Sequence, residues 1–122
     1  MKKRIALLTA LAVVGGSVFA GVGTAATHKT KAAKVVKVTA TDFKFKLSLK
    51  TFKKGVPYKF VLTNKGTAFH NFDIQGLKAT KIIAHNKTAS FTVTFKKAKK
   101  YQYVCDVPRH IELGMAGYIT VR

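Results

Sequence analysis

Apolar and polar residues alternate along much of the chain beyond residue 34, with the period of two that is typical of a β-strand with one buried face. The alternation is clearest over residues 43–49 and 91–95, where phenylalanine, leucine and valine alternate with lysine, serine and threonine. No stretch shows a convincing helical period. The same pattern predicts further strands at residues 35–41, 58–63, 71–75, 79–83, 101–105 and 118–121.

Turn-forming residues separate most of these predicted strands. Seven or eight short strands within fewer than 100 residues cannot bury a face as one open sheet, so two packed sheets are expected. We therefore predict an all-β fold, a Greek-key β-sandwich. The turn signals are Gly55 with Pro57, the run Asn64-Lys65-Gly66, Gly76, the pair His85-Asn86 and the segment 96–100.

The N-terminal residues have the layout of a secretory signal peptide. A basic start, Met1 to Arg4, is followed by apolar residues 5–14 and then by small residues up to Ala26. Earlier cleavage and an uncleaved membrane anchor remain alternatives. The predicted organisation is a signal peptide at 1–26, a flexible basic lead-in at 27–34 and one domain at 35–122.

The chain is strongly basic, with 23 lysine and arginine residues against four acidic ones and a formal net charge of +19. Removal of residues 1–26 takes three basic residues away and leaves a charge of about +16. Such a charge attracts acidic protein partners, an anionic cell wall or anionic lipid headgroups. Nucleic acid is not expected as a partner, because nearly all of the charge is lysine spread along the predicted strands, where outer faces must be polar.

Cys105 is the single cysteine of the chain and cannot form an internal disulfide. Exported domains of this size are often stabilised by disulfides, so a lone thiol requires another explanation. The alternatives are an inert buried thiol, an intermolecular disulfide and a metal-bound thiolate.

The residues around Cys105 favour the metal-bound thiolate. His110 and Met115 follow it at equal intervals, C-x4-H-x4-M, and His70 supplies a second imidazole from the start of a distant strand. Two imidazoles, one thiolate and a weak axial thioether form the donor set of blue-copper sites, whereas a structural zinc site would recruit a fourth strong ligand. We therefore predict a single copper ion, cycling between Cu(I) and Cu(II), held by His70, Cys105, His110 and Met115.

The pair His70-Asn71 and the loop with Cys105, His110 and Met115 resemble the cupredoxin family of plastocyanin-like and azurin-like type 1 blue-copper proteins. The resemblance covers residues 35–121. It implies that the two histidines and the cysteine are equatorial ligands and that the methionine is the long axial one. It also implies that Asn71 ties the two ligand loops together, as outer contacts that orient metal ligands commonly do.

Two positions depart from the family pattern. Arg109 stands where many relatives have glycine before the second histidine, and Val104 stands where plastocyanins have an aromatic residue before the cysteine. An electron route through that aromatic residue is therefore not expected. The exposed edge of His110 is the expected electron port, and the apolar docking patch around it is predicted to consist of Pro108, Ile111 and Leu113.

Four other chemically active side chains have simpler interpretations. His85 lies in a polar turn and is expected to be solvated rather than a ligand, and His28 is expected in a disordered tail. Tyr101 and Tyr103 share a strand face with Cys105, so they are expected to pack beneath the site as core residues.

The predicted function is one-electron transfer by an exported, monomeric carrier of the periplasm or cell exterior, whose redox-protein partners are acidic at the docking surface. Enzymatic chemistry is not expected, because four protein donors leave no open position for a substrate. Copper storage or delivery is one alternative, and a metal-free basic sandwich that binds anionic envelope polymer is another. Peripheral association with an anionic membrane or cell wall stays open, whereas a binuclear copper site is excluded because it needs two bridging thiolates.

Overall fold

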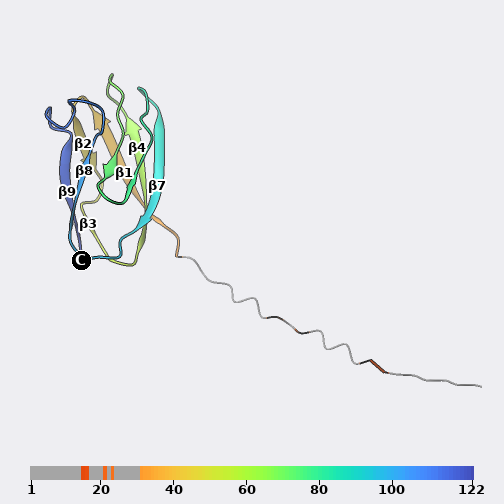
Figure 1. Ribbon diagram of the computed structural model, residues 1–122. Helices are drawn as coiled ribbons and strands as arrows, with labels where there is room; N and C mark the ends of the chain where they lie inside the picture. Colours follow the sequence, from red (N-terminus) through yellow and green to blue (C-terminus); the bar gives the residue numbers. More distant parts are fainter. Residues whose placement is uncertain (1–14, 17–20, 22, 24–30) are drawn as a thin grey trace, which may run out of the picture.

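The computed structural model describes residues 15–16, 21, 23 and 31–122 (Figure 1). Most of the predicted signal peptide, together with His28 and the first part of the lead-in, lies outside these residues. Within them, no helix is long and apolar enough to cross a membrane. The strands are β1 (Lys34–Thr41), β2 (Lys44–Leu47), β3 (Thr51–Phe52), β4 (Pro57–Asn64), β5 (Asp73–Ile74), β6 (Lys78–Ala79), β7 (Thr88–Thr94), β8 (Lys100–Val104) and β9 (Ala116–Val121).

The strands form two packed sheets, so the predicted all-β sandwich is confirmed (Figure 1). One sheet has the order β2-β1-β4-β7 and the other β3-β9-β8-β5-β6. Two pairs are parallel, β1 with β4 and β3 with β9, and the remaining pairs are antiparallel. The described residues form nine strands rather than seven or eight because β3, β5 and β6 each contribute a strand of only two residues.

The segments 71–75 and 79–83 form much less strand than their residue pattern predicts. Only the two-residue strands β5 and β6 pair there, and His70 with Ile83 forms an isolated bridge. The reason is that side chains replace ladder bonds next to β5. The Phe72 amide donates a hydrogen bond to the Thr80 hydroxyl (3.0 Å). The Asn71 side chain accepts one from the Asp106 amide (2.7 Å), in the loop that follows β8.

The space between the sheets is filled mainly by aromatic rings. Tyr58, Phe60 and Leu62 are the buried alternate residues of β4, and the Phe60 ring lies 5.5 Å from that of Phe52 and 5.7 Å from that of Phe72. Such edge and offset ring contacts add to the free energy gained from burial. Tyr101 and Tyr103 of β8 are also buried in this cluster, which confirms the core role predicted for them.

The two ends of the sandwich carry different loops. At one end lie the last residues of β1, β4 and β8 and the start of β9, with the loops 65–72 and 105–115 between them. At the opposite end lie the start of β1 and the C-terminus (Figure 1). We call these the site end and the distal end.

Candidate metal centre

The C-terminal ligand loop is closed by its own backbone. The Cys105 amide donates to the Met115 carbonyl (3.0 Å), and the Met115 amide donates to the His110 carbonyl (3.0 Å). A further bond inside the loop, from the His110 amide to the Val107 carbonyl (3.1 Å), forms the turn between the first two candidate ligands. The C-x4-H-x4-M spacing therefore folds into a compact loop whose three candidate ligands have fixed relative positions.

Three of the predicted ligands converge on one point. The Nδ1 atoms of His70 and His110 are 3.1 Å apart, and the Cys105 Sγ atom lies 3.5 Å from the His110 Nδ1 and 3.9 Å from the His70 Nδ1. Among the described residues, these three form the group of histidine, cysteine and acidic side chains whose donor atoms all lie within 4.8 Å of one another. All three side chains are buried.

The separations of these donor atoms fit a single transition-metal ion. Donors bound at about 2.0–2.3 Å in a trigonal plane lie roughly 3.5–4 Å apart, which is close to the observed separations. Met115 is fully buried and is joined by backbone hydrogen bonds to both Cys105 and His110. The donor chemistry, two imidazoles and a thiol with a thioether on the same loop, is the set that suits copper in both oxidation states.

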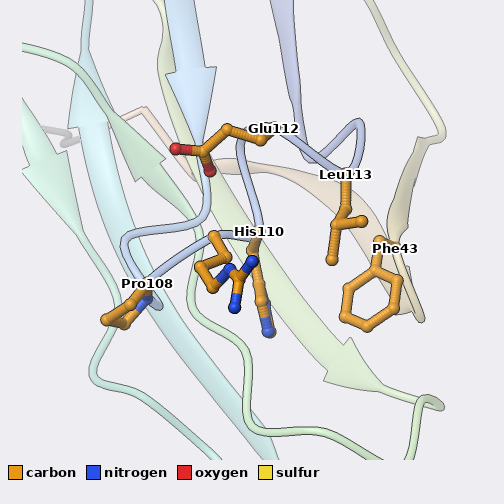
Figure 2. Close-up of a pocket in the computed structure, with 6 residues that line it drawn as sticks. Phe43, Pro108, His110, Glu112 and Leu113 are labelled. Atoms are coloured by element: carbon orange, nitrogen blue, oxygen red, sulfur yellow. The ribbon is translucent and has the colours of Figure 1, made fainter.

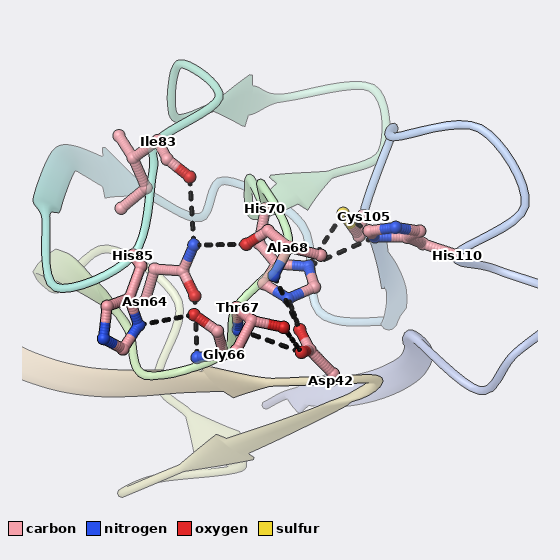
Figure 3. A network of polar contacts seen from close by, with 10 residues as sticks. All are labelled: Asp42, Asn64, Gly66, Thr67, Ala68, His70, Ile83, His85, Cys105 and His110. Atoms are coloured by element: carbon pink, nitrogen blue, oxygen red, sulfur yellow. Dashed lines mark hydrogen bonds and ion pairs between the residues drawn. The ribbon is translucent and has the colours of Figure 1, made fainter.

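Asp42 is a member of the site that the sequence pattern did not indicate (Figure 3). Its Oδ1 lies 2.8 Å from the His70 Nε2, and the carboxylate also accepts hydrogen bonds from the Thr67 hydroxyl (2.6 Å) and from the Thr67 and Ala68 amides (2.9 and 3.2 Å). The Thr67 hydroxyl first, and then the Thr67 amide and His70, hold the pKa of Asp42 well below its usual range. The ionised carboxylate therefore accepts a hydrogen bond from the Nε2–H group, and this tautomer of the imidazole directs the Nδ1 lone pair at the other donors.

The loop before His70 is organised by Asn64, the last residue of β4. Its Nδ2 donates to the Ala68 and Ile83 carbonyls (2.8 and 3.0 Å), and its Oδ1 accepts from the Gly66 amide (2.9 Å). Asn64 is fully buried, so these bonds satisfy an amide that would otherwise be costly to bury. The sequence pattern indicated only a turn at this position.

Gly66 allows the close approach between Asp42 and His70. A Cβ atom at Gly66 would overlap the Asp42 Oδ1 and would lie 2.9 Å from the His70 Nε2. From outside, the exposed His85 donates through Nδ1 to the Gly66 carbonyl (2.7 Å). His85 thus lies in an exposed turn and away from the donor group, but it contacts the loop that carries His70.

Asn71 joins the two ligand segments. Its Oδ1 accepts from the Asp106 amide (2.7 Å), and its Nδ2 donates to the Asp106 carboxylate (2.7 Å). Asn71 follows His70 and Asp106 follows Cys105, so this pair of bonds holds two of the candidate ligands in register.

Arg109, one of the two departures from the family pattern, has an unusual backbone conformation. Arg109 has a φ of 71°, in the left-handed region where glycine pays no steric penalty. The loop therefore needs the conformation that glycine favours, although this chain has arginine there. Val104, the other departure from the family pattern, is a buried core residue of β8.

His110 forms the floor of an open hollow on the surface (Figure 2). The Phe43 ring packs edge-on against its imidazole, with centroids 4.9 Å apart. Burial first, and then the neighbouring His70, hold the pKa of His110 below its usual value. Ile111 of the predicted patch is exposed but does not line the hollow, whose walls are Phe43, Pro108, Arg109, Glu112 and Leu113.

Comparison with known proteins agrees with this fold and donor set. The family described as the cupredoxin-like domain matches residues 10–121. The chain belongs to this family. Family membership and the convergence of the donor atoms confirm the prediction of a single copper site in this cupredoxin.

Two similar proteins are copper-resistant cuproproteins named CopI. The one from Rubrivivax gelatinosus is 26% identical over 113 residues, which cover 75% of this chain and 68% of that protein. The one from Pseudomonas aeruginosa is 37% identical over 41 residues, so the match spans 34% of this cupredoxin and only 23% of that relative.

Several solved structures share the fold. Auracyanin A from Chloroflexus aurantiacus, described as a blue copper protein, superposes with a TM-score of 0.67 and 18% identity over 75% of this chain and 100% of that one. Reduced auracyanin from Roseiflexus castenholzii superposes with a TM-score of 0.64 and is 18% identical in sequence. The match covers 75% of this chain and 98% of that one. The McoA multicopper oxidase of Aquifex aeolicus superposes with a TM-score of 0.62 and is 14% identical in sequence. The match covers 73% of this chain but only 26% of the oxidase.

Proposed function

We propose that this cupredoxin is an exported blue-copper protein that carries one electron at a time. His70, Cys105 and His110 are the proposed equatorial ligands, and Met115 is the proposed axial ligand. The observation that carries the proposal is the convergence of two imidazole nitrogens and one sulfur, all buried, from two loops that are held in place by hydrogen bonds.

When bound, copper supplies a one-electron couple between Cu(I) and Cu(II), and the axial thioether favours the reduced ion. The protein residues keep the ligands from rearranging. Asp42 fixes the ring orientation and tautomer of His70, and Asn71 holds the two loops together. Every buried side-chain nitrogen or oxygen among the described residues has a hydrogen-bond partner, as expected of a rigid site.

His110 is the proposed port for the electron. Its ring lies at the floor of the hollow, with Pro108, Leu113 and Phe43 beside it (Figure 2). Apolar surface of this kind lets a redox partner approach the ring closely and exclude water. We propose transient complexes of a monomeric carrier with redox proteins that are acidic at the docking surface, and no catalysis of bond chemistry.

Export is proposed from the sequence. The basic, apolar and small-residue layout of residues 1–26 supports a signal peptide, and residues 27–34 and 35–122 then form the lead-in and the copper domain. The proposed location is the periplasm or the cell exterior.

The test is a visible absorption spectrum of residues 27–122 after addition of copper(II). We expect an intense thiolate-to-copper band that is absent in Cys105→Ala. Ser90→Ala, an exposed position on the outer face of β7, is the matched control and keeps the band. A colourless protein would overturn the proposal and favour a metal-free basic sandwich, and a band that survives in Cys105→Ala would overturn Cys105 as a copper ligand.

Copper storage or delivery is a second candidate, because the two similar curated proteins are described as copper-resistant cuproproteins. The two functions differ in how firmly the reduced ion is held. A carrier retains Cu(I) for hours against a Cu(I) chelator and exchanges electrons rapidly with its oxidised form. A delivery protein transfers Cu(I) to the chelator within minutes, and chelator absorbance measured over time separates the two.

A further inference from the structure

The acidic residues of the chain lie at one end of the long axis of the sandwich, whereas basic residues occur at both ends. All four acidic residues lie at or near the site end. Asp42 contacts His70, and Glu112 lines the hollow over His110. Asp106 accepts a hydrogen bond from Asn71, and Asp73 is paired with Val104, the last residue of β8. Burial, and then the nearby charge of Asp106, raise the pKa of Asp73.

The distal end carries exposed basic residues on three adjacent segments and no acidic residue. Backbone hydrogen bonds connect these segments: the Lys54 amide donates to the Arg122 carbonyl (2.8 Å) and the Val121 amide to the Lys99 carbonyl (2.9 Å). The charges therefore sit on one rigid surface rather than on independent loops. We define the basic patch as Lys50, Lys53, Lys54, Lys96, Lys97, Lys99, Lys100 and Arg122, all of which are exposed.

Residues 31–33, which precede β1, meet the domain at this same end (Figure 1). Lys34, the first residue of β1, is paired with Tyr58 near the start of β4, and the Tyr58 hydroxyl accepts a hydrogen bond from the Lys53 amide (2.9 Å). The apolar run at residues 5–14 of the sequence precedes this entry point.

We propose that the basic patch binds the surface of an anionic lipid bilayer and holds the domain with its site end directed away from the membrane. Lysine ammonium groups are compact, strongly hydrated charges. Because they are spread over three adjacent segments, they match a diffuse anionic surface better than a single small ligand. Each lysine near such a surface strengthens binding about fivefold, and the effect falls off within a Debye length. At the site end the four acidic residues offset the charge of the basic residues there, so the distal end is attracted more strongly and sets the orientation.

This orientation leaves the hollow over His110 open to a partner in solution. It would be useful to a redox protein that works beside a membrane, but the binding itself requires no copper. The membrane proposal therefore stands or falls independently of the proposed electron transfer.

The test is sedimentation with vesicles of zwitterionic lipid containing about one quarter anionic phosphatidylglycerol, compared with purely zwitterionic vesicles. Residues 27–122 are used, since they contain every described strand of both sheets. Two variants remove the same number of charges at opposite ends. The distal variant is Lys53→Gln, Lys54→Gln, Lys96→Gln and Lys97→Gln, and the site-end variant is Lys44→Gln, Lys65→Gln, Lys81→Gln and Lys87→Gln.

We expect binding to anionic vesicles alone, a loss of at least about 50-fold in the distal variant, and a loss below about threefold in the site-end variant. Equal losses in the two variants would mean that net charge alone drives binding and would overturn the patch. Failure to bind anionic vesicles would overturn the proposal outright. Displacement by soluble polyglutamate at equal charge concentration would replace the membrane with an acidic polymer as the partner.

The orientation is measured separately by acetylating the lysines of the vesicle-bound protein and locating the modified residues by mass spectrometry. Lysines of the basic patch should be protected at least about threefold relative to the free protein, and Lys65 and Lys81 should not be protected. Uniform protection would contradict a single orientation. Unchanged circular dichroism of the variants confirms that they are folded.

Discussion

The two segments that carry the candidate copper ligands are supported in different ways. The loop 105–115 carries three of them and is held largely by hydrogen bonds within its own backbone. The segment 64–70 carries His70 and is held by side chains, Asn64 from within and Asp42 and His85 from other loops (Figure 3). The first segment is stabilised by contacts between residues that are close in sequence. The second is stabilised by contacts with loops that are distant in sequence.

This difference predicts where single substitutions act most strongly. Backbone hydrogen bonds survive most side-chain changes, so the loop 105–115 should tolerate substitution away from the ligands themselves. The segment 64–70 depends on individual side chains, and a buried polar group left without its partner is expensive. Single substitutions should therefore destabilise the segment around His70 more than the loop 105–115.

The largest effect is expected for Asn64→Ala. The substitution removes three hydrogen bonds and leaves the Gly66 amide and two carbonyls without this partner, which should lower the free energy of unfolding by about 3 kcal/mol. Urea denaturation of the copper-free protein measures this change in the free energy of unfolding. Asn71→Ala is the matched control, because it removes the side-chain hydrogen bonds to Asp106 of the loop 105–115, a partner that is exposed to water, and it should lower the free energy of unfolding by about 1 kcal/mol. Equal costs would contradict the distinction between the two segments.

Gly66→Ala tests the close approach of Asp42 to His70. The added methyl group would overlap the Asp42 carboxylate, and overpacking of this kind should lower the free energy of unfolding by about 2 kcal/mol. In the background of Asp42→Ala the overlap is relieved, so the cost of Gly66→Ala should fall by at least half. A double-mutant cycle by thermal denaturation measures this coupling, and strictly additive effects would show that the contact is unimportant.

Asp42→Asn keeps the shape of the side chain but removes its charge next to His70. A carboxylate stabilises the more positive Cu(II) state, so we expect the reduction potential to rise by about 60 mV, which is a tenfold shift in a one-electron equilibrium. Protein-film voltammetry gives the value. Asp73→Asn, an acidic residue of the same end that contacts no candidate ligand, should change the potential by less than about 15 mV. A similar shift in both variants would indicate a general charge effect.

The smallest effect is expected in the loop 105–115, at Arg109. Its left-handed backbone favours glycine, so Arg109→Gly should be more stable than Arg109→Ala by about 1 kcal/mol. Comparing two truncations separates the backbone effect from loss of the arginine side chain. Chemical denaturation measures the difference, and a more stable alanine variant would show that the loop relaxes to another conformation.

Much of the fold and of the donor set could be predicted from the sequence alone. Period-two alternation records which residues face the core, and this predicted the sandwich and the buried positions of Tyr101 and Tyr103. The short spacing of Cys105, His110 and Met115 reflects a loop closed by its own backbone, so a linear motif contains nearly all the information needed to recognise it.

The tertiary structure decided the remainder. Asp42 is 28 residues from His70, and Asn64 is 19 residues from Ile83, so neither contact leaves a local pattern. The gathering of the acidic residues at one end and of the basic patch at the other also has no periodic signature. These contacts depend on strand order, because the parallel pairing of β1 with β4 brings the ends of both strands to the same end of the sandwich. Alternation along a strand records which face is buried, whereas only the arrangement of strands determines which loops meet.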